Sequence, residues 1–378
     1  MHRVSAPRSH LPSSSPPLAG GDARPLVDAS LNEAARRGAS DVHVEPTAQG
    51  YEVRYRVDGM LETVARHDAG TGRGMVGRLM VMGHLLTYRL DVPQEGRIST
   101  PLPATGKAGP VDLRLAIMPT THGLRAAVRM PAELIQPRSL EELGLPPAAL
   151  DGLRGFAAAD AGMLIVTGPA GSGKTTTIYA LLEHIARTSP GLSIIALEDP
   201  VERDLPGVTQ IEVSPFGELT YERSLRSILR QDPQVLALGE IRDAATASLA
   251  LQAALSGHRL VCTLHAASPG GAIARLVEMG MEPYQVTSAL YAVLAQRLLR
   301  KRNPEGPGYR GRVPVAELAI MNAEVREAVM RRSDADSLQR LIAQRPGHLP
   351  LRKNAQALVE SGVTDVGEVE RVLGPTGT

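Results

Sequence analysis

The sequence predicts an α/β protein with two separately folded parts, followed by a small helical region. Residues 136–300 alternate short apolar segments with stretches of helical spacing, which is typical of a parallel sheet with helical crossovers. Residues 26–135 instead alternate apolar and polar positions, which indicates strands with one face in a core. At 378 residues, the chain is long enough to form two or three such cores.

The first part is predicted to be an α/β domain. The spacing predicts helices over 26–37 and 73–90 and strands over 41–45, 51–57, 111–117 and 124–130. Asp58-Gly59, between the second strand and the next apolar segment, is a hairpin signal. Residues 1–25 are rich in Ser, Pro and Gly, so we expect a disordered tail. Residues 131–137 begin and end with proline and are expected to be the linker.

The second part, residues 136–300, is expected to form the larger sheet. Its predicted strands are 163–167, 193–198, 235–239 and 259–264. In open sheets of this kind, ligands bind beyond the carboxyl ends of the strands. Residues 301–378 are expected to be a region of short helices with Gly and Pro breaks.

Composition argues against several functional classes. The chain has 41 Lys and Arg against 40 Asp and Glu, and 3% aromatic residues, so neither charge nor stacking surface favours nucleic acid as a partner. The single cysteine, Cys262, argues against disulfides and against a cysteine zinc site, so we expect no zinc and a cytoplasmic location. No apolar run approaches the ~18 residues of a membrane span, and we expect no signal peptide.

A phosphate-binding loop is predicted at residues 168–175, which read Gly-Pro-Ala-Gly-Ser-Gly-Lys-Thr and fit the pattern G-x-x-x-x-G-K-[ST]. A predicted strand precedes this loop and helical spacing follows it, as the pattern requires. Lys174 is expected to reach the β- and γ-phosphates of a nucleoside triphosphate, and the Thr175 hydroxyl to ligate Mg²⁺. The expected nucleotide-binding residues of the loop are Gly168, Gly171, Ser172, Gly173, Lys174, Thr175 and Thr176.

The use of lysine supports this prediction. Only four of the 41 basic residues are lysines, so arginine is the usual cation of this chain. Lysine at position 174 therefore indicates a site that requires a compact point charge rather than a planar guanidinium. The alternative is a plain glycine turn between a strand and a helix.

Three polar clusters follow predicted strands and are candidates for catalysis. The first, Glu198-Asp199-Pro-Val-Glu202, offers a carboxylate that can deprotonate a water and neighbours that can hold Mg²⁺ through its water shell. Glu240 is expected to bind Mg²⁺ by itself, because Gly239 stands where many such enzymes have Asp. His265 is expected to emerge near the γ-phosphate. For each cluster, a helix cap, a solvated strand end or a structural histidine is the alternative.

Arginines are candidates for stabilising transferred phosphoryl charge. Arg226 and Arg230 are four residues apart, which predicts one helix face, and Arg242 follows the third predicted strand. We expect Arg230 and Arg242 to contact the nucleotide. In the first part, Arg97 and Arg114 have no other evident use for their charge. Surface solvation is the alternative for each arginine.

Together these residues resemble a family, the secretion and pilus-assembly ATPases of bacterial type II secretion, type IV pilus and DNA-uptake systems. The resemblance extends over residues 26–375, in the order of the family's motifs. The matching segments are 39–46, 54–59, 92–97, 168–177, 197–202, 230–233, 239–243, 257–265, 296–298 and 311–312.

The resemblance implies a PAS-like N-terminal domain joined to a RecA-like P-loop ATPase domain, assembled as a homohexamer that uses ATP and Mg²⁺. It implies that Glu198, Asp199 and Glu202 form an acidic box, in which Glu198 activates the attacking water. It further implies that Glu240 is the Walker B acid and that His265 senses the γ-phosphate.

The resemblance also implies that the N-terminal domain carries Arg97 and Arg114 onto the nucleotide. The implied partner is an inner-membrane platform protein, which would make the chain cytoplasmic and peripheral to that membrane. The extension or secretion branch is more similar than the retraction branch. One departure is that residues 300–310 contain no cysteine, whereas the usual secretion-type member has a four-cysteine zinc insertion there.

Two other functions stay open at this point. One is a nucleotide-binding regulatory or structural ring subunit without efficient hydrolysis, and the other is a RecA-type nucleic-acid motor. The sequence also leaves open which machine is served, and whether Glu198 or Glu240 is the general base.

Overall fold

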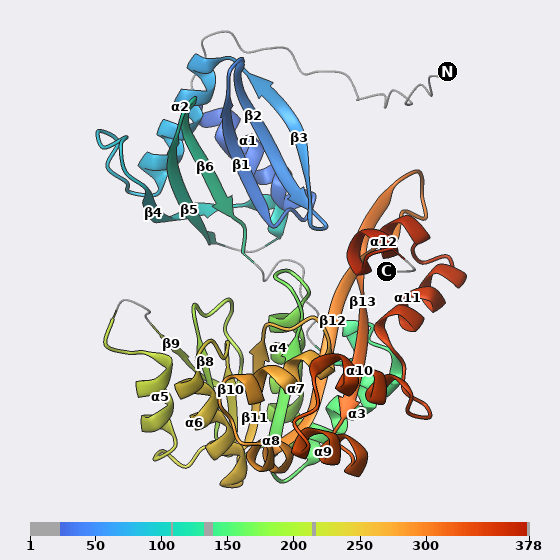
Figure 1. The fold of residues 1–378 in the computed structure, drawn as a ribbon. Coiled ribbons are helices and arrows are strands. Elements are labelled where there is room, and N and C mark those ends of the chain that lie inside the picture. Colours follow the sequence, from blue (N-terminus) through green and yellow to red (C-terminus); the bar gives the residue numbers. More distant parts are fainter. Residues whose placement is uncertain (1–22, 107–108, 132–138, 214–216, 376–378) are drawn as a thin grey trace. The chain divides into compact units, whose positions relative to one another are not determined.

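The structure is a computed structural model that describes residues 23–106, 109–131, 139–213 and 217–375. The chain forms two compact units, residues 1–131 and 132–378, each with its own sheet (Figure 1). Most of the predicted tail and almost all of the predicted linker lie outside the described residues.

Unit 1 is a six-stranded antiparallel sheet in the order β3-β2-β1-β6-β5-β4 (Figure 1). Its elements are α1 (Ala23–Arg36), β1 (Asp41–Thr47), β2 (Gly50–Val57), β3 (Met60–His67), α2 (Ala69–Met82), β4 (Gln94–Pro101), the 3₁₀ turn η1 (Pro103–Thr105), β5 (Pro110–Thr120) and β6 (Gly123–Arg129). Leu31 of α1 and Leu79 of α2 pack in one core with Leu113 of β5. Alternate residues of β5 are buried and exposed, so one sheet face is free of this core.

The second helix of unit 1 differs from its prediction, since α2 covers Ala69–Met82 rather than 73–90. Asp68 caps its N-terminus by accepting hydrogen bonds from two backbone N–H groups at 2.8 and 3.0 Å. Beyond its end, the Gln94 amide accepts a hydrogen bond from the N–H of Leu86 at 2.9 Å and donates to its carbonyl at 3.1 Å. These side chains satisfy backbone groups that a longer helix would use, and helical spacing alone does not reveal them.

Unit 2 is a seven-stranded sheet in the order β13-β12-β7-β11-β10-β8-β9, parallel except for β13 (Figure 1). Its first elements are η3 (Glu141–Leu143), α3 (Pro147–Ala158), β7 (Gly162–Thr167), α4 (Lys174–Thr188), β8 (Ile194–Glu198), β9 (Thr209–Glu212), α5 (Tyr221–Ile228), β10 (Val235–Leu238), α6 (Ala244–Leu255) and β11 (Arg259–Leu264). They are followed by α7 (Pro269–Glu278), α8 (Pro283–Ala289), β12 (Leu290–Arg302), β13 (Tyr309–Ile320), α9 (Ala323–Met330), α10 (Ala335–Ala343), α11 (Leu351–Glu360) and α12 (Val366–Leu373).

The sheet of unit 2 has a hydrophobic core on each face. Met163 and Ile165 of β7 pack with α5 to α10, whereas Leu164 and Val166 pack with α3 and α4. Successive residues of a strand point to opposite faces, so a strand buried on both sides is apolar throughout. All four strands that the sequence predicts in this part are present.

The hairpin β12–β13 is the main departure from the sequence prediction. We expect no strand after residue 264 and short helices over 301–378, but β12 and the 12-residue β13 continue the sheet beyond β7. A run buried on both faces has no two-residue period, so its sequence does not separate strand from helix. Pairing of β12 with β7 on one side and β13 on the other decides the outcome.

A buried carboxylate holds α12 against β12. The Glu368 side chain is 0% exposed, accepts hydrogen bonds from Arg300 Nη2 at 2.7 Å and Arg371 Nε at 2.7 Å, and also accepts from the backbone N–H of Arg300 at 2.9 Å. Burial raises the pKa of Glu368, but the hydrogen bonds from Arg371 and Arg300 outweigh it and lower the pKa to about 2.

Glu368→Gln is therefore expected to lower the free energy of unfolding by about 3 kcal/mol at pH 7, because two arginines lose a buried counter-charge. The folded pKa lies below the ordinary value of 4.5. The stabilisation is thus present above about pH 5 and is lost as the pH falls toward 2. Urea denaturation at pH 7 and at pH 3 measures both effects. Glu370→Gln, on the exposed face of the same helix, is the control, and equal midpoints for the two variants at pH 7 would contradict the prediction.

Candidate active site

The carboxyl ends of the parallel strands in unit 2 gather the predicted residues at one edge of the sheet. β7, β8, β10 and β11 run in the same direction, so their C-terminal residues lie beside one another. β12 is parallel to them, reaches this edge at Ala295 opposite Thr167, and continues past it. Hydrogen bonds continue across this edge beyond the strands. The Gly239 N–H donates to Leu197 O at 2.8 Å, Ile241 N–H to Thr263 O at 3.0 Å, and Ala266 N–H to Thr167 Oγ1 at 2.9 Å.

The predicted phosphate loop connects β7 to α4, and β12 holds it from the side. A Cβ at Gly168 would lie 2.4 Å from Gln296 O, and a Cβ at Gly173 would lie 2.8 Å from Gln296 Nε2. Gly173 also has φ +89°, a conformation that favours glycine. Gln296 Nε2 donates to Ser172 O at 2.9 Å, and Gln296 Oε1 accepts from Thr177 Oγ1 at 2.8 Å. The buried Gln296 amide therefore ties the C-terminal side of the loop to the first turn of α4, while its backbone carbonyl lies against Gly168.

Lys174 begins α4 and folds back over the loop. Its Nζ donates to Gly168 O at 2.9 Å and to Pro169 O at 3.0 Å. Burial lowers the pKa of Lys174, and the nearby Glu240 carboxylate opposes that change. Within the described part of the chain, no carboxylate forms an ion pair with Lys174. The ammonium is thus available to an anion.

Other groups of the loop also fit a phosphate. Gly173 gives α4 no side-chain cap, so the first N–H groups of α4 have no side-chain acceptor from it. Ser172 Oγ is buried without a hydrogen-bond partner. Thr175 and Thr176 follow Lys174 in the first turn of α4. A helix N-terminus with free donors and an uncompensated cation is a binding site for a phosphate group.

Glu240, after β10, lies at the centre of a second group. Its Oε1 is 2.6 Å from His265 Nε2, and its Oε2 accepts a hydrogen bond from Arg242 Nε at 2.6 Å. Arg242 Nη1 also lies 3.8 Å from Asp199 Oδ2, after β8. The Glu240 side chain is 16% exposed and that of His265 is 56% exposed, so the histidine faces solvent while the carboxylate is shielded. The structure therefore brings together Asp199, Glu240, Arg242 and His265.

Glu198 ends β8 but has different neighbours. It accepts a hydrogen bond from the Tyr179 hydroxyl and another from Gln210 Nε2, the latter at 2.8 Å. Burial raises the pKa of Glu198, and these hydrogen bonds only partly oppose it. Glu202 is exposed, and its backbone N–H donates to Tyr179 Oη at 3.1 Å. Among the described residues, no hydrogen bond or ion pair joins Glu198 to Glu240 or His265.

The predicted arginines fall into separate places. Arg226 is exposed and pairs with Glu222 at 2.9 Å, while Arg230 lies beyond the end of α5, so the two do not share one face of a helix. The helix ends in a turn at Leu229 and Arg230, where the Gln231 N–H donates to Ile228 O at 2.8 Å, and Asp232 then has φ +51°.

Arg97 and Arg114 belong to unit 1, where they are opposite each other on β4 and β5. Arg129 of β6 is in turn opposite Arg114. Like charges at opposed positions of a sheet destabilise it unless an anion or carboxylate lies nearby. Asp41 lies 3.4 Å from Arg129 and supplies one such carboxylate.

Sequence reasoning missed Tyr221 as a neighbour of this site. A Cβ at Gly239 would lie 2.4 Å from the Tyr221 hydroxyl, so a larger residue at this position would require the Tyr221 side chain to move. Burial raises the pKa of Tyr221, as does the Asp199 carboxylate, so the phenol stays protonated and can donate a hydrogen bond. No sequence motif marks Tyr221, because it reaches Gly239 from the start of α5.

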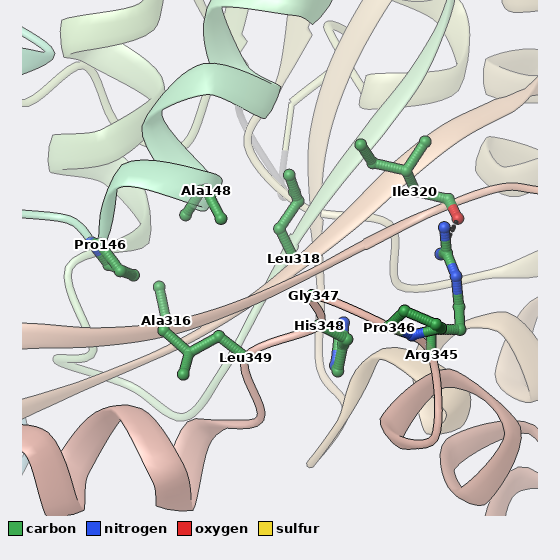
Figure 2. A pocket seen from close by; sticks show the side chains of 11 residues that line it. Pro146, Ala148, Ala316, Leu318, Ile320, Arg345, Pro346, Gly347, His348 and Leu349 are labelled. Carbon is green, nitrogen blue, oxygen red and sulfur yellow. Dashed lines mark hydrogen bonds between the residues drawn. The ribbon is translucent and has the colours of Figure 1, made fainter.

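A pocket of about 140 Å³ lies elsewhere in unit 2, between the start of α3, β13 and the segment between α10 and α11 (Figure 2). Arg345 crosses its mouth and donates from Nη1 to Ile320 O at 2.8 Å. None of the predicted nucleotide-site residues lines it. His348 lines the pocket, and its Nε2 lies 2.9 Å from Oε1 of the buried Glu317, so this imidazole nitrogen already has a partner within the protein.

Across the described ranges, no three His, Cys, Asp or Glu side chains are grouped as a metal centre requires. None of the helices that the structure describes has the length and apolar content needed to cross a bilayer.

Known proteins are similar to this chain over most of its length. The family model described as "Type II/IV secretion system protein" matches residues 20–371. Type II secretion system protein HxcR of Pseudomonas aeruginosa is 38% identical over 366 residues, which cover 92% of this chain and 76% of that protein. Type II secretion system ATPase E of Vibrio cholerae is 36% identical over 383 residues, covering 92% of this chain and 74% of that protein.

A solved structure shares the fold. The X-ray structure of the ATPase DotB of Legionella pneumophila has a TM-score of 0.73 to this chain at 19% identity, covering 94% of this chain and 97% of that one. The mixed α/β fold with its mainly parallel sheet is thus shared with a solved ATPase structure. The chain therefore belongs to the type II/IV secretion system protein family and is an ATPase of that family.

Proposed function

We propose that this chain is the hexameric motor of a type II secretion or type IV pilus machine, and that it hydrolyses ATP to drive assembly of the pseudopilus or pilus. The observation that carries the proposal is the contact of Glu240 with His265 and Arg242 at the same sheet edge as the phosphate loop. The secretion-system names of the two relatives favour secretion over pilus assembly.

The chain's own groups can bind and orient the nucleotide. Lys174 and the uncapped start of α4 offer the positive charge and N–H donors that the phosphates require. Thr175 and Glu240 are the proposed Mg²⁺ site, with Glu240 acting through a water, and the ion would neutralise phosphate charge when bound. Phosphoryl transfer mainly requires positioning and electrostatic stabilisation, which these fixed groups supply.

Glu240 is the proposed general base, and Glu198 a positioning residue. Glu240 is near Lys174, and its two oxygens are oriented by His265 and Arg242. Both oxygens of Glu198 instead accept hydrogen bonds from Tyr179 and Gln210. Location therefore separates the two carboxylates, since Glu198 is hydrogen-bonded to side chains of α4 and β9 whereas Glu240 lies near Lys174 and the phosphate loop.

Unit 1 is proposed to supply arginines to the nucleotide. Arg97 and Arg114 are opposed on neighbouring strands of its exposed face, which concentrates positive charge there. A phosphate group would relieve the repulsion between them, as arginines from a second domain do in phosphoryl transfer. Closure of unit 1 onto the nucleotide and its release after hydrolysis would then be the motion that does work.

The partners follow from the family rather than from contacts. We propose a homohexamer, an inner-membrane platform protein as the part that is moved, and a cytoplasmic location at the membrane through that partner. The type II secretion system in the relatives' names supports this arrangement.

Glu240→Gln is expected to lower kcat for ATP by about 100-fold or more while MgATP still binds, because an amide cannot accept the proton of the attacking water. Glu198→Gln is expected to lower kcat by less than about tenfold, since its amide oxygen still accepts from Tyr179. Phosphate release and calorimetric MgATP binding by the purified protein measure both.

Glu218→Gln, at an exposed position paired with Arg223, is the control and should match wild type. Lys174→Ala should lose MgATP binding. The base assignment is wrong if Glu198→Gln abolishes hydrolysis while Glu240→Gln keeps it. MgATP binding without phosphate release by the wild-type protein would instead favour a non-hydrolysing ring subunit.

Arg114→Gln and Arg97→Gln are each expected to reduce kcat by at least about 100-fold, because transition-state charge loses a guanidinium. Steady-state ATPase rates of the full chain measure the loss. Arg66→Gln removes the same charge from β3 of the same sheet, where Arg66 is 74% exposed and pairs with Glu52, and should leave kcat unchanged. Equal rates for all three variants would show that the arginines of unit 1 do not act in hydrolysis.

A further inference from the structure

Arg297 spans the back of the phosphate loop from β12 to the segment after β11. Its Nη1 donates to Gln296 O, on its own strand, at 2.9 Å. Its Nη2 donates to Ala267 O at 2.8 Å, two residues after His265. Because β7 lies between β11 and β12, this guanidinium crosses the end of β7, where the phosphate loop begins.

The charge of Arg297 has no counter-ion within unit 2. Across the part of the chain that the structure describes, its guanidinium has carbonyl acceptors and no carboxylate within ion-pair distance. Burial lowers the pKa of Arg297. A half-buried arginine that serves only to hold the fold would ordinarily be paired, as Arg300 on the same strand is with Glu368.

The position of this charge is specific to the phosphate loop. Arg297 Nη1 lies 3.1 Å from where a Cβ of Gly168 would be, and Lys174 Nζ donates to the carbonyl of that same glycine at 2.9 Å. Arg297 also lowers the pKa of Lys174, so the two cations interact. Two uncompensated cations around one buried glycine repel each other until an anion binds between or beside them.

We propose that Arg297 is a second fixed cation of the phosphate site and a positioning residue that ties the His265 segment to the phosphate loop. The inference rests on the proposed function, since it assigns Arg297 to the same nucleotide. Its charge strengthens the attraction for the phosphates through the field at the loop. Its guanidinium, hydrogen-bonded to Gln296 O and Ala267 O, fixes the position of the His265 segment relative to that loop.

Two substitutions of Arg297 test its charge and its positioning role separately. Arg297→Met keeps an unbranched side chain that resembles the aliphatic part of arginine and removes the charge, so the MgATP and MgADP dissociation constants are expected to rise about 10-fold to 100-fold. Arg297→Lys keeps the charge but cannot donate to both carbonyls in the same geometry. Its MgATP affinity is expected to stay within about threefold of wild type, while kcat falls by about tenfold or more.

The test uses the full chain, with calorimetric binding of MgATP and MgADP, steady-state ATPase rates and thermal melts with and without MgATP. Lys301→Gln removes a charge from an exposed position of the same strand and should match wild type in every measurement. Because Arg297 is uncompensated, Arg297→Met should keep the melting temperature of the nucleotide-free protein and lose most of the shift that MgATP produces.

Each outcome decides the proposal. Wild-type MgATP affinity in Arg297→Met, or equal kcat in Arg297→Lys and wild type, overturns the corresponding half. Were Arg297→Met to unfold, the Arg297→Lys comparison of kcat with affinity would still decide the positioning half. A wild-type protein that neither binds nor hydrolyses MgATP would refute the proposed function itself, which is a different result from a silent Arg297 in an active enzyme.

Discussion

The arrangement of unit 2 depends on one pairing, that of β7 between β11 and β12 with all three strands parallel. Each strand then contributes a different group to the same place. β7 leads into the phosphate loop and β11 into His265, while β12 passes this edge with Gln296 and Arg297 in its middle. Carboxyl ends of neighbouring parallel strands bring together residues that are more than a hundred positions apart in the chain. The parallel direction of the strands, more than any single motif, brings the groups of the site together.

Glu198 and Glu240 illustrate how surroundings divide the tasks of two similar residues. Each follows a buried strand, and β8 and β10 are neighbours in the sheet. The side chain of Tyr179, from the face that α4 covers, reaches one of them, whereas His265 and Arg242 reach the other. One carboxylate therefore fastens α4 to β8, and the other is left near Lys174. Different hydrogen-bond partners thus give two similar carboxylates different tasks.

What the sequence predicts well is local, and what it misses depends on distant partners. The phosphate loop and the four central strands follow from short patterns of glycine, lysine and apolar residues, and all four strands are present. The β12–β13 hairpin does not, because its apolar run fits a helix until β7 pairs with it. Sequence patterns also do not predict the role of Tyr221 or the partners of Glu198. Tyr221 lies close to Gly239 from a different part of the chain, and the partners of Glu198 come from α4 and β9. Arg297 lies in a segment that the family resemblance marks, but only its contacts indicate a task.

The continuity of β12 has a mechanical consequence. Gln296 is hydrogen-bonded to the phosphate loop and Arg300 to Glu368 of α12, and only three residues of extended backbone lie between them. An extended, paired strand is stiff along its length, so it does not stretch to absorb a pull on either residue. A displacement of α12 along the sheet would therefore either bend the β12–β13 hairpin or be transmitted to the phosphate loop beside Lys174. The C-terminal helix α12 and the phosphate loop are therefore mechanically coupled through β12.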